Sequence, residues 1–218
     1  AKASTEVATH MVESLGDAGQ VVVIAHDSKS LTSQERVNNF IAEIQNNHPN
    51  MSVAGPYYMD QIDDIKKTIA EQQLDIVPVE GQELDEEQQT ALDDAIAQIT
   101  DEDIYNYILE MNPDVKGIFA TNGDTTMQAL TACEGKDMKD VVIMGYDADQ
   151  EEIDAMKDGR IAGMIVQNPY GMGYATVVAE ARCVLNMGNE ANVNTGYTWV
   201  TPDNIEDRTV QDILYAEK

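Results

Sequence analysis

The residues of this sequence that could do chemistry are amides, carboxylates, hydroxyls and aromatic rings that directly follow short apolar runs. A carboxylate or an amide can bind two adjacent hydroxyls, and an aromatic ring can cover the apolar face of a sugar. The set therefore suits a neutral polyhydroxylated ligand. The simpler interpretation, that they are turn and N-cap residues, stays open for each of them at this point. In chain order they are His26, Asp27, Ser28, Ser30, Tyr57, Tyr58, Asn122, Asp124, Tyr146, Asp147, Gln167 and Asn168.

The same sequence offers little for catalysis or metal binding. His10, His26 and His48 are scattered and do not form a metal-binding set. His26 and Asp27 could act as an acid–base pair, but adjacent polar residues after a strand usually belong to a loop. No nucleophile motif of the G-x-S-x-G type is present. We therefore predict a binding protein that is not an enzyme and that uses no cofactor and no metal.

The apolar runs alternate with stretches of helical periodicity. The run Val21–Ala25 is continuous and largely β-branched, which is typical of a strand buried on both faces of a parallel sheet. The alternation predicts an α/β fold, a parallel sheet flanked by helices with right-handed crossovers. Ligands of such sheets bind beyond the carboxyl ends of the strands, which is where the polar residues lie. Further strands are expected at Met51–Ala54 (closed by Gly55-Pro56), Lys116–Ala120, Val141–Gly145, Ile161–Val166 and Gly196–Val200.

Helices are expected in the segments between these strands, where apolar residues recur at helical spacing. The expected segments are Ala3–Leu15, Thr32 or Ser33 to Asn46, the stretch after the loop Thr121–Asp124 to about Cys133, the stretch after Tyr146-Asp147 to about Lys157, Tyr170–Met187 and a short terminal helix.

One stretch breaks this alternation. The 48 residues between Lys67 and Lys116 contain 14 acids and no Lys, Arg or His. Leu84–Ile99 and Asp101–Met111 within it still have the periodicity of amphipathic helices. We predict an acidic, mostly helical insertion at about 68–112 with one exposed face.

Composition limits the partners that the chain can have. Its 218 residues include 40 acids and 13 Lys and Arg, which gives a formal charge of −27. This balance argues against nucleic acid and against anionic membranes as partners. No apolar run approaches the ~18 residues that a membrane-spanning helix needs, so no direct membrane insertion is expected. Cys133 and Cys183 have neither metal nor disulfide spacing, and each is predicted to be a small buried residue.

Four segments resemble motifs of periplasmic sugar-binding proteins of the ribose/galactose class. Gly117–Leu130 resembles their strand, N-D and helix motif, and Val141–Asp147 resembles their VVGFD strand. Asp158–Tyr174 is similar to their DGKIAATVAQNPYEMG segment, and Gln34–Phe40 to their ERxxGF helix start. The resemblance covers residues 1–58 and 112–218 and implies a type I periplasmic-binding fold.

The resemblance also implies a set of ligand-binding residues in this sequence. Arg36 matches the ligand arginine of the helix start, and Tyr57 or Tyr58 is the candidate for the aromatic wall. Ser30 is a further candidate because of its position after the first strand. The sequence departs from the family pattern at Asn39, where the family has glycine, and at Gly123, where it has aspartate. The matching polar residues that follow the later strands are Asn122, Asp147 and Gln167.

The function that the resemblance implies is that of an extracytoplasmic solute-binding protein of a sugar ABC importer. Such a protein binds a mono- or small oligosaccharide between two lobes and is recognised by the permease subunits in the membrane. The alternatives are the effector-binding domain of a LacI-type repressor and the input domain of a sugar-sensing receptor. Repressors carry a P-x-D element before the VVGFDD strand and a second aspartate after it, whereas this chain has Gly135–Asp140 and Ala148.

The resemblance also divides the chain. Residues 1–166 match a C-terminal-type lobe, 167–195 a crossing segment with a helix of the N-terminal lobe, and 196–218 a return strand with a terminal helix. We therefore expect a fragment that lacks most of the N-terminal lobe. Helix Tyr170–Met187 would then leave an apolar patch that favours self-association.

Overall fold

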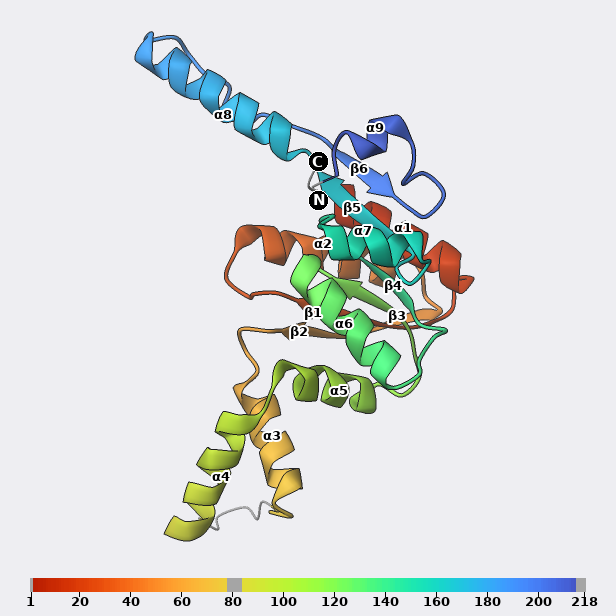
Figure 1. The fold of residues 1–218 in the computed structure, drawn as a ribbon, viewed down its shortest axis with the longest axis vertical. Coiled ribbons are helices and arrows are strands. Elements are labelled where there is room, and N and C mark those ends of the chain that lie inside the picture. The colour runs from red at the N-terminus through yellow and green to blue at the C-terminus, as the bar shows by residue number, and fades with distance from the viewer. Residues whose placement is uncertain (1, 78–83, 215–218) are drawn as a thin grey trace.

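A single sheet organises the computed structural model, which describes residues 2–77 and 84–214 (Figure 1). Its strand order is β2-β1-β3-β4-β5-β6. The first five of these strands are parallel, which confirms the predicted α/β class, whereas β6 pairs antiparallel with β5. The strands are β1 (Gly19–Ala25), β2 (Met51–Tyr58), β3 (Val115–Ala120), β4 (Val142–Tyr146), β5 (Gly163–Gln167) and β6 (Tyr197–Val200).

Helices cover both faces of the sheet and bury a core on each. On one face α1 (Lys2–Leu15) and α2 (Leu31–Asn47) pack over a core in which the rings of Phe40 and Phe119 stack 4.2 Å apart. On the other face α5 (Asp101–Met111), α6 (Gly123–Gly135) and α7 (Gln150–Lys157) pack over aliphatic side chains. Because β1 is buried on both faces, its sequence is continuously apolar.

Strand β2 differs from its prediction. The strand was expected to end before Gly55-Pro56, but it continues through this pair, whose peptide bond is cis, to Tyr58. Proline is tolerated here because β2 is an edge strand, and the register of β1 against it shifts between Val22 and Ile24. Gly55 has φ +91°, and a Cβ atom there would lie 2.8 Å from the carbonyl oxygen of Val23. Glycine is therefore required at this position in the strand.

The acidic stretch forms two separate structures. Helices α3 (Asp63–Gln73), which was not predicted, and α4 (Glu86–Gln98) project together from one end of the molecule (Figure 1). Helix α5 instead lies on the sheet and buries Ile104 and Ile108 in the core. The helices expected at Leu84–Ile99 and Asp101–Met111 are thus confirmed as α4 and α5. The insertion at about 68–112 stays a prediction, and its last helix is part of the main body.

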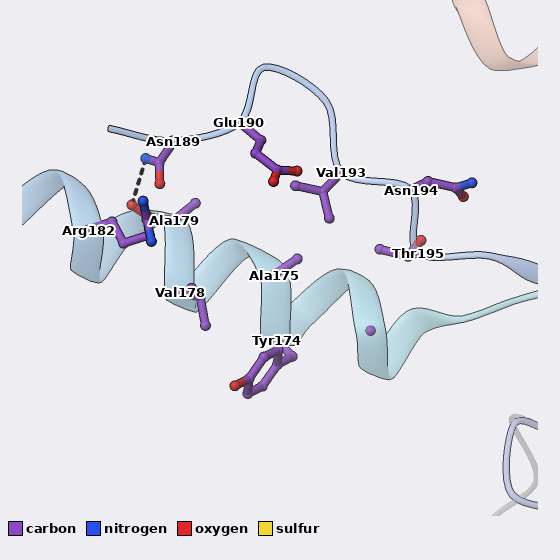
Figure 2. A pocket seen from close by; sticks show the side chains of 11 residues that line it. Tyr174, Ala175, Val178, Ala179, Arg182, Asn189, Glu190, Val193, Asn194 and Thr195 are labelled. Atoms are coloured by element: carbon purple, nitrogen blue, oxygen red, sulfur yellow. Dashed lines mark hydrogen bonds between the residues drawn. The ribbon is translucent and has the colours of Figure 1, made fainter. Parts of the chain in front are cut away.

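Helix α8 (Pro169–Val184) projects from the opposite end of the molecule, and none of its residues is buried (Figure 1). The chain returns along it in residues 188–196, here called the return segment, before β6 and α9 (Arg208–Gln211). Asn189 Nδ2 donates to the carbonyl oxygen of Ala179, and a groove of about 400 Å³ separates the two segments (Figure 2).

The exposure of α8 corrects one expectation about the cysteines. Cys133 is buried in α6 as predicted, but Cys183 is exposed because it lies on α8. Among the described residues, no helix is both long and apolar enough to cross a membrane.

Candidate ligand-binding site

Arg36 connects the carboxyl ends of three strands. It extends from α2, and its Nη1 donates to the carbonyl oxygen of Thr121, the residue after β3. Its Nη2 donates to Oε1 of Gln167 at the end of β5, at 3.0 Å. The guanidinium carbon lies 4.0 Å from the centroid of the Tyr146 ring, at the end of β4. A planar guanidinium suits this combination of two directed hydrogen bonds and a ring contact, and the two hydrogen bonds hold it in a defined orientation.

Asp147 follows β4 and is half-buried. Its backbone N–H donates to the carbonyl oxygen of Ile165 at 2.9 Å, and its φ is +78°. Its Oδ2 accepts from the N–H of Gly123, at the start of α6, at 3.3 Å. Burial raises the pKa of Asp147, while Arg36 and the Gly123 N–H oppose this shift. The carboxylate is therefore held at the N-terminus of α6.

Asn122 caps α6 with one half of its amide. Its Oδ1 accepts from the N–H of Thr125 at 3.1 Å and from the hydroxyl of the same residue at 2.7 Å. The interpretation of Asn122 as an N-cap residue is thus confirmed for its Oδ1 atom. The Nδ2 atom has no hydrogen-bond partner among the described residues, so it is available to a ligand. We refer to Arg36, Asn122, Tyr146, Asp147 and Gln167 as the Arg36 cluster.

Ser30 is engaged within its own loop. Its Oγ donates to Asp27 Oδ2 at 2.8 Å and accepts from the N–H of Ser33 at 3.2 Å, which caps α2. Asp27 in turn contacts Nε2 of His26 at 3.1 Å, and Nδ1 of His26 lies 2.8 Å from the Thr121 hydroxyl. Burial lowers the pKa of His26, which favours the neutral imidazole. These contacts give Ser30 a structural role, and its role as a ligand residue stays a prediction.

Tyr57 and Tyr58 lie inside β2 and point to opposite faces of the sheet. The Tyr57 hydroxyl accepts from Nδ2 of Asn112 at 2.9 Å, and its ring packs against the core under α5. Tyr58 packs against the core under α1 and α2. At most one of the two rings can therefore face a given ligand, and an aromatic wall from this strand stays a prediction.

Two residues of the site were not in the predicted ligand set. The guanidinium of Arg36 lies over the ring of Tyr146, and the Tyr146 hydroxyl is 2.7 Å from Oγ of Ser4. Thr121 is fully buried and accepts from Arg36 through its carbonyl oxygen. Both stand at the end of an apolar run, Tyr146 as the last residue of β4 and Thr121 directly after β3. This signal identified Tyr146 as a polar residue of the sheet edge and could have identified Thr121 as well.

Comparison with known proteins agrees with this architecture. The periplasmic binding protein domain matches residues 1–182. The ribose import binding protein of Salmonella typhimurium is 35% identical over 66 residues, which are 30% of this chain and 22% of that protein. The ribose import binding protein of Haemophilus influenzae is 31% identical over 86 residues, 39% of this chain and 29% of that protein.

Solved structures share the fold. An ABC transporter solute-binding protein from Agrobacterium vitis with bound D-fucose superposes with a TM-score of 0.73 at 22% identity. A carbohydrate transporter solute-binding protein from Agrobacterium radiobacter in complex with D-arabinose gives 0.71, also at 22% identity. Each match covers 97% of this chain but only 61% of the solved chain. Since the family domain matches most of its residues, the chain belongs to the periplasmic binding protein family.

Proposed function

We propose that this chain is the sugar-binding part of an extracytoplasmic solute-binding protein of an ABC importer, and that it binds a mono- or small oligosaccharide. The observation that carries the proposal is the hydrogen bond between Arg36 and Gln167, which joins residues 131 positions apart at the carboxyl edge of the sheet. Both residues also match the ligand positions that the resemblance to sugar-binding proteins implies.

The chemistry of the Arg36 cluster supports a sugar as the ligand. The Asp147 carboxylate can accept hydrogen bonds from two neighbouring hydroxyls, and the guanidinium of Arg36 can donate to sugar oxygens. The amides of Asn122 and Gln167 can do both. The set therefore contains both donors and acceptors for hydroxyl groups.

Transport rather than catalysis is supported by the relatives, which are named for ribose import or as transporter solute-binding proteins. The proposed partners are a small carbohydrate and the membrane permease subunits of the importer, and the proposed location is outside the cytoplasm. The formal charge of −27 argues against a nucleic-acid partner.

The division of the chain at 166 and 195 is part of the same proposal. Its support is that α8 and the return segment leave the sheet and that none of their residues is buried. In this proposal they belong to a second lobe and residues 1–166 form the ligand-binding lobe.

A titration with monosaccharides and disaccharides, followed by amide chemical shifts, tests the proposal. A sugar that binds should shift the amides of Asp147 and Asn122, and Asp147→Ala should abolish this effect. Asp140→Ala is the matched control, because Asp140 is an exposed carboxylate of the loop before β4. Unchanged sugar binding by Asp147→Ala, or no binding of any sugar, would contradict the proposal.

A further inference from the structure

Glu152, in the first turn of α7, is a buried acid whose hydrogen bonds are only half made. Its side chain is 1% exposed. Its Oε2 accepts from the N–H of Asp149 at 2.8 Å, whereas its Oε1 has no hydrogen-bond partner among the described residues. Buried polar atoms normally have a partner, so an exception calls for a physical reason. The capping of α7 explains the position of Oε2 but not that of Oε1.

The carboxyl group of Glu152 lies directly against Gly123, at the start of α6. A Cβ atom at Gly123 would lie 3.0 Å from Oε1 and 3.1 Å from Oε2 of Glu152. The N–H of Gly123 donates to Oδ2 of Asp147 at 3.3 Å, and Gly123 directly follows Asn122, the cap of α6. Glu152 therefore supports, through Gly123, two residues of the Arg36 cluster.

The surroundings of Glu152 favour its protonated form. Burial raises the pKa of Glu152 to about 8; the Asp149 N–H opposes this shift, and the charges of Asp147, Asp149 and Asp124 add to it. Asp147 and Asp149 belong to the loop after β4, and Asp124 belongs to α6. At neutral pH the carboxyl group is therefore uncharged, and it can lie against Gly123 without repelling Asp147.

Ionisation of Glu152 would disturb this arrangement. A carboxylate there would be repelled by Asp147 and would have one oxygen buried without a donor. Glu152 also lines, with Asp124 and Asp149, a groove of about 460 Å³ into which the charged side chain could move toward water. We propose, on the basis of the proposed sugar-binding function, that Glu152 is a positioning residue of the sugar site, which keeps Gly123 and thereby Asp147 in place while its carboxyl group is protonated.

The pH dependence of sugar affinity tests this inference on the whole chain. Calorimetry with D-ribose, D-galactose and D-glucose between about pH 7 and pH 9.5 gives the Kd of each sugar. The wild type should bind about tenfold more weakly at the upper limit, the effect of one lost hydrogen bond to a charged group. Glu152→Gln cannot ionise and should keep a constant Kd. His26 does not contribute in this range, because burial lowers its pKa and leaves it neutral.

Glu151→Gln is the matched control, because it removes an exposed carboxylate from the same turn of α7 and should keep the wild-type dependence. A role of Glu152 in stability alone would change the unfolding curve but leave the Kd independent of pH. An equal Kd for the wild type at both limits, or the same pH dependence in Glu152→Gln, would overturn the inference.

A pH titration without sugar, followed by amide chemical shifts, separates this inference from the proposed function. The amides of Gly123 and Asp147 should shift with a midpoint near pH 8 in the wild type and in Glu151→Gln, but not in Glu152→Gln. If none of the sugars binds at any pH, the proposed function fails, and this titration alone decides the positioning role. Amides of Gly123 and Asp147 that do not respond near this pH would overturn the inference.

Discussion

The guanidinium of Arg36 lies over the ring of Tyr146, with 4.0 Å between the guanidinium carbon and the ring centroid. The Tyr146 hydroxyl is itself 2.7 Å from Oγ of Ser4 in α1. Arg36 is thus oriented by a ring that is fixed from the opposite side, so its free N–H groups are directed before any ligand arrives. Such preorganisation reduces the entropy lost on binding.

Arg36→Lys should weaken sugar binding about tenfold while leaving the charge unchanged, because an ammonium cannot donate to Thr121 and Gln167 in the same planar geometry. Calorimetry or NMR titration with the best sugar measures this effect. Arg160→Lys is the matched control, since within the described part of the chain the Arg160 guanidinium forms surface ion pairs with Glu134 and Asp158 and no others. Equal affinity of Arg36→Lys and the wild type would show that sugar binding does not need the planar guanidinium group.

Glu152 should make the stability of the protein depend on pH. Its side chain is 1% exposed, and its Oε1 has no partner among the described residues. Burial raises its pKa from 4.5 to about 8; the Asp149 N–H opposes this shift, and Asp147, Asp149 and Asp124 add to it. Between these two values the folded state keeps a proton that the unfolded state has released. The free energy of unfolding should therefore fall as the pH rises through this window.

Glu152→Gln tests this dependence, because the amide cannot ionise. Near pH 8 the variant should be more stable than the wild type by about 2 kcal/mol, and its stability should change less between pH 5 and pH 8. Urea denaturation at several pH values measures this. Glu151→Gln, an exposed neighbour, should keep the wild-type profile. If the free energy of unfolding depended on pH in the same way in the wild type and in Glu152→Gln, Glu152 would be excluded as the cause of the pH dependence.

Gly163→Ala should destabilise the pairing of β5 with β6. A Cβ atom at Gly163 would lie 2.1 Å from Cζ2 of Trp199, whose indole also stacks on His10 with the ring centroids 4.5 Å apart. The indole cannot move without losing that contact, so we expect a loss of about 2 kcal/mol in thermal or urea unfolding.

Gly173→Ala provides the control for Gly163→Ala. Gly173 is exposed in α8, and a Cβ atom there would meet nothing within 4 Å. Alanine should stabilise this helix by up to about 1 kcal/mol through its higher helix propensity. The same destabilisation from both substitutions would show that the contact with Trp199 is not the cause.

The apolar surface of α8 should cause self-association of the isolated chain. Val177 and Val184 are 64% and 82% exposed, and Tyr170 and Tyr174 are exposed on the same helix. Val177→Asp should shift the equilibrium toward the monomer, as measured by sedimentation at several concentrations. Thr176→Asp adds the same charge at a neighbouring exposed polar position and should have a smaller effect. A wild-type chain that remains monomeric at high concentration would contradict this prediction.

The sequence predicted best those features that depend on local pattern. The run Val21–Ala25 reads as a strand because every side chain in it is buried, on one face or the other. Gly55-Pro56 misled the prediction because the pair is a common turn signal. Its place in an edge strand depends on the strand order, which no local pattern encodes.

The site was predictable only in part for a similar reason. Arg36, Asn122 and Asp147 could be named from motifs and from their positions after strands. The contact of Arg36 with Tyr146 joins residues 110 positions apart and depends on how α2 packs over the sheet. Ser30 and Asn122 show that a strand-end polar residue can serve as a cap, and only the geometry reveals which of its atoms remain available.

The projecting helix α8 has a mechanical consequence for the Arg36 cluster. Gln167 and Tyr197 are paired in the antiparallel ladder, so both connections to α8 leave the sheet at one point. The Asn168 amide, which donates to the carbonyl oxygen of Thr195 at 3.2 Å, links the two connections there. Helix α8 and the return segment are therefore attached to the sheet together, through the adjacent ends of β5 and β6. A change in the direction of α8 at this attachment should move Gln167, which accepts from Arg36, so the position of α8 and the geometry of the Arg36 cluster are coupled.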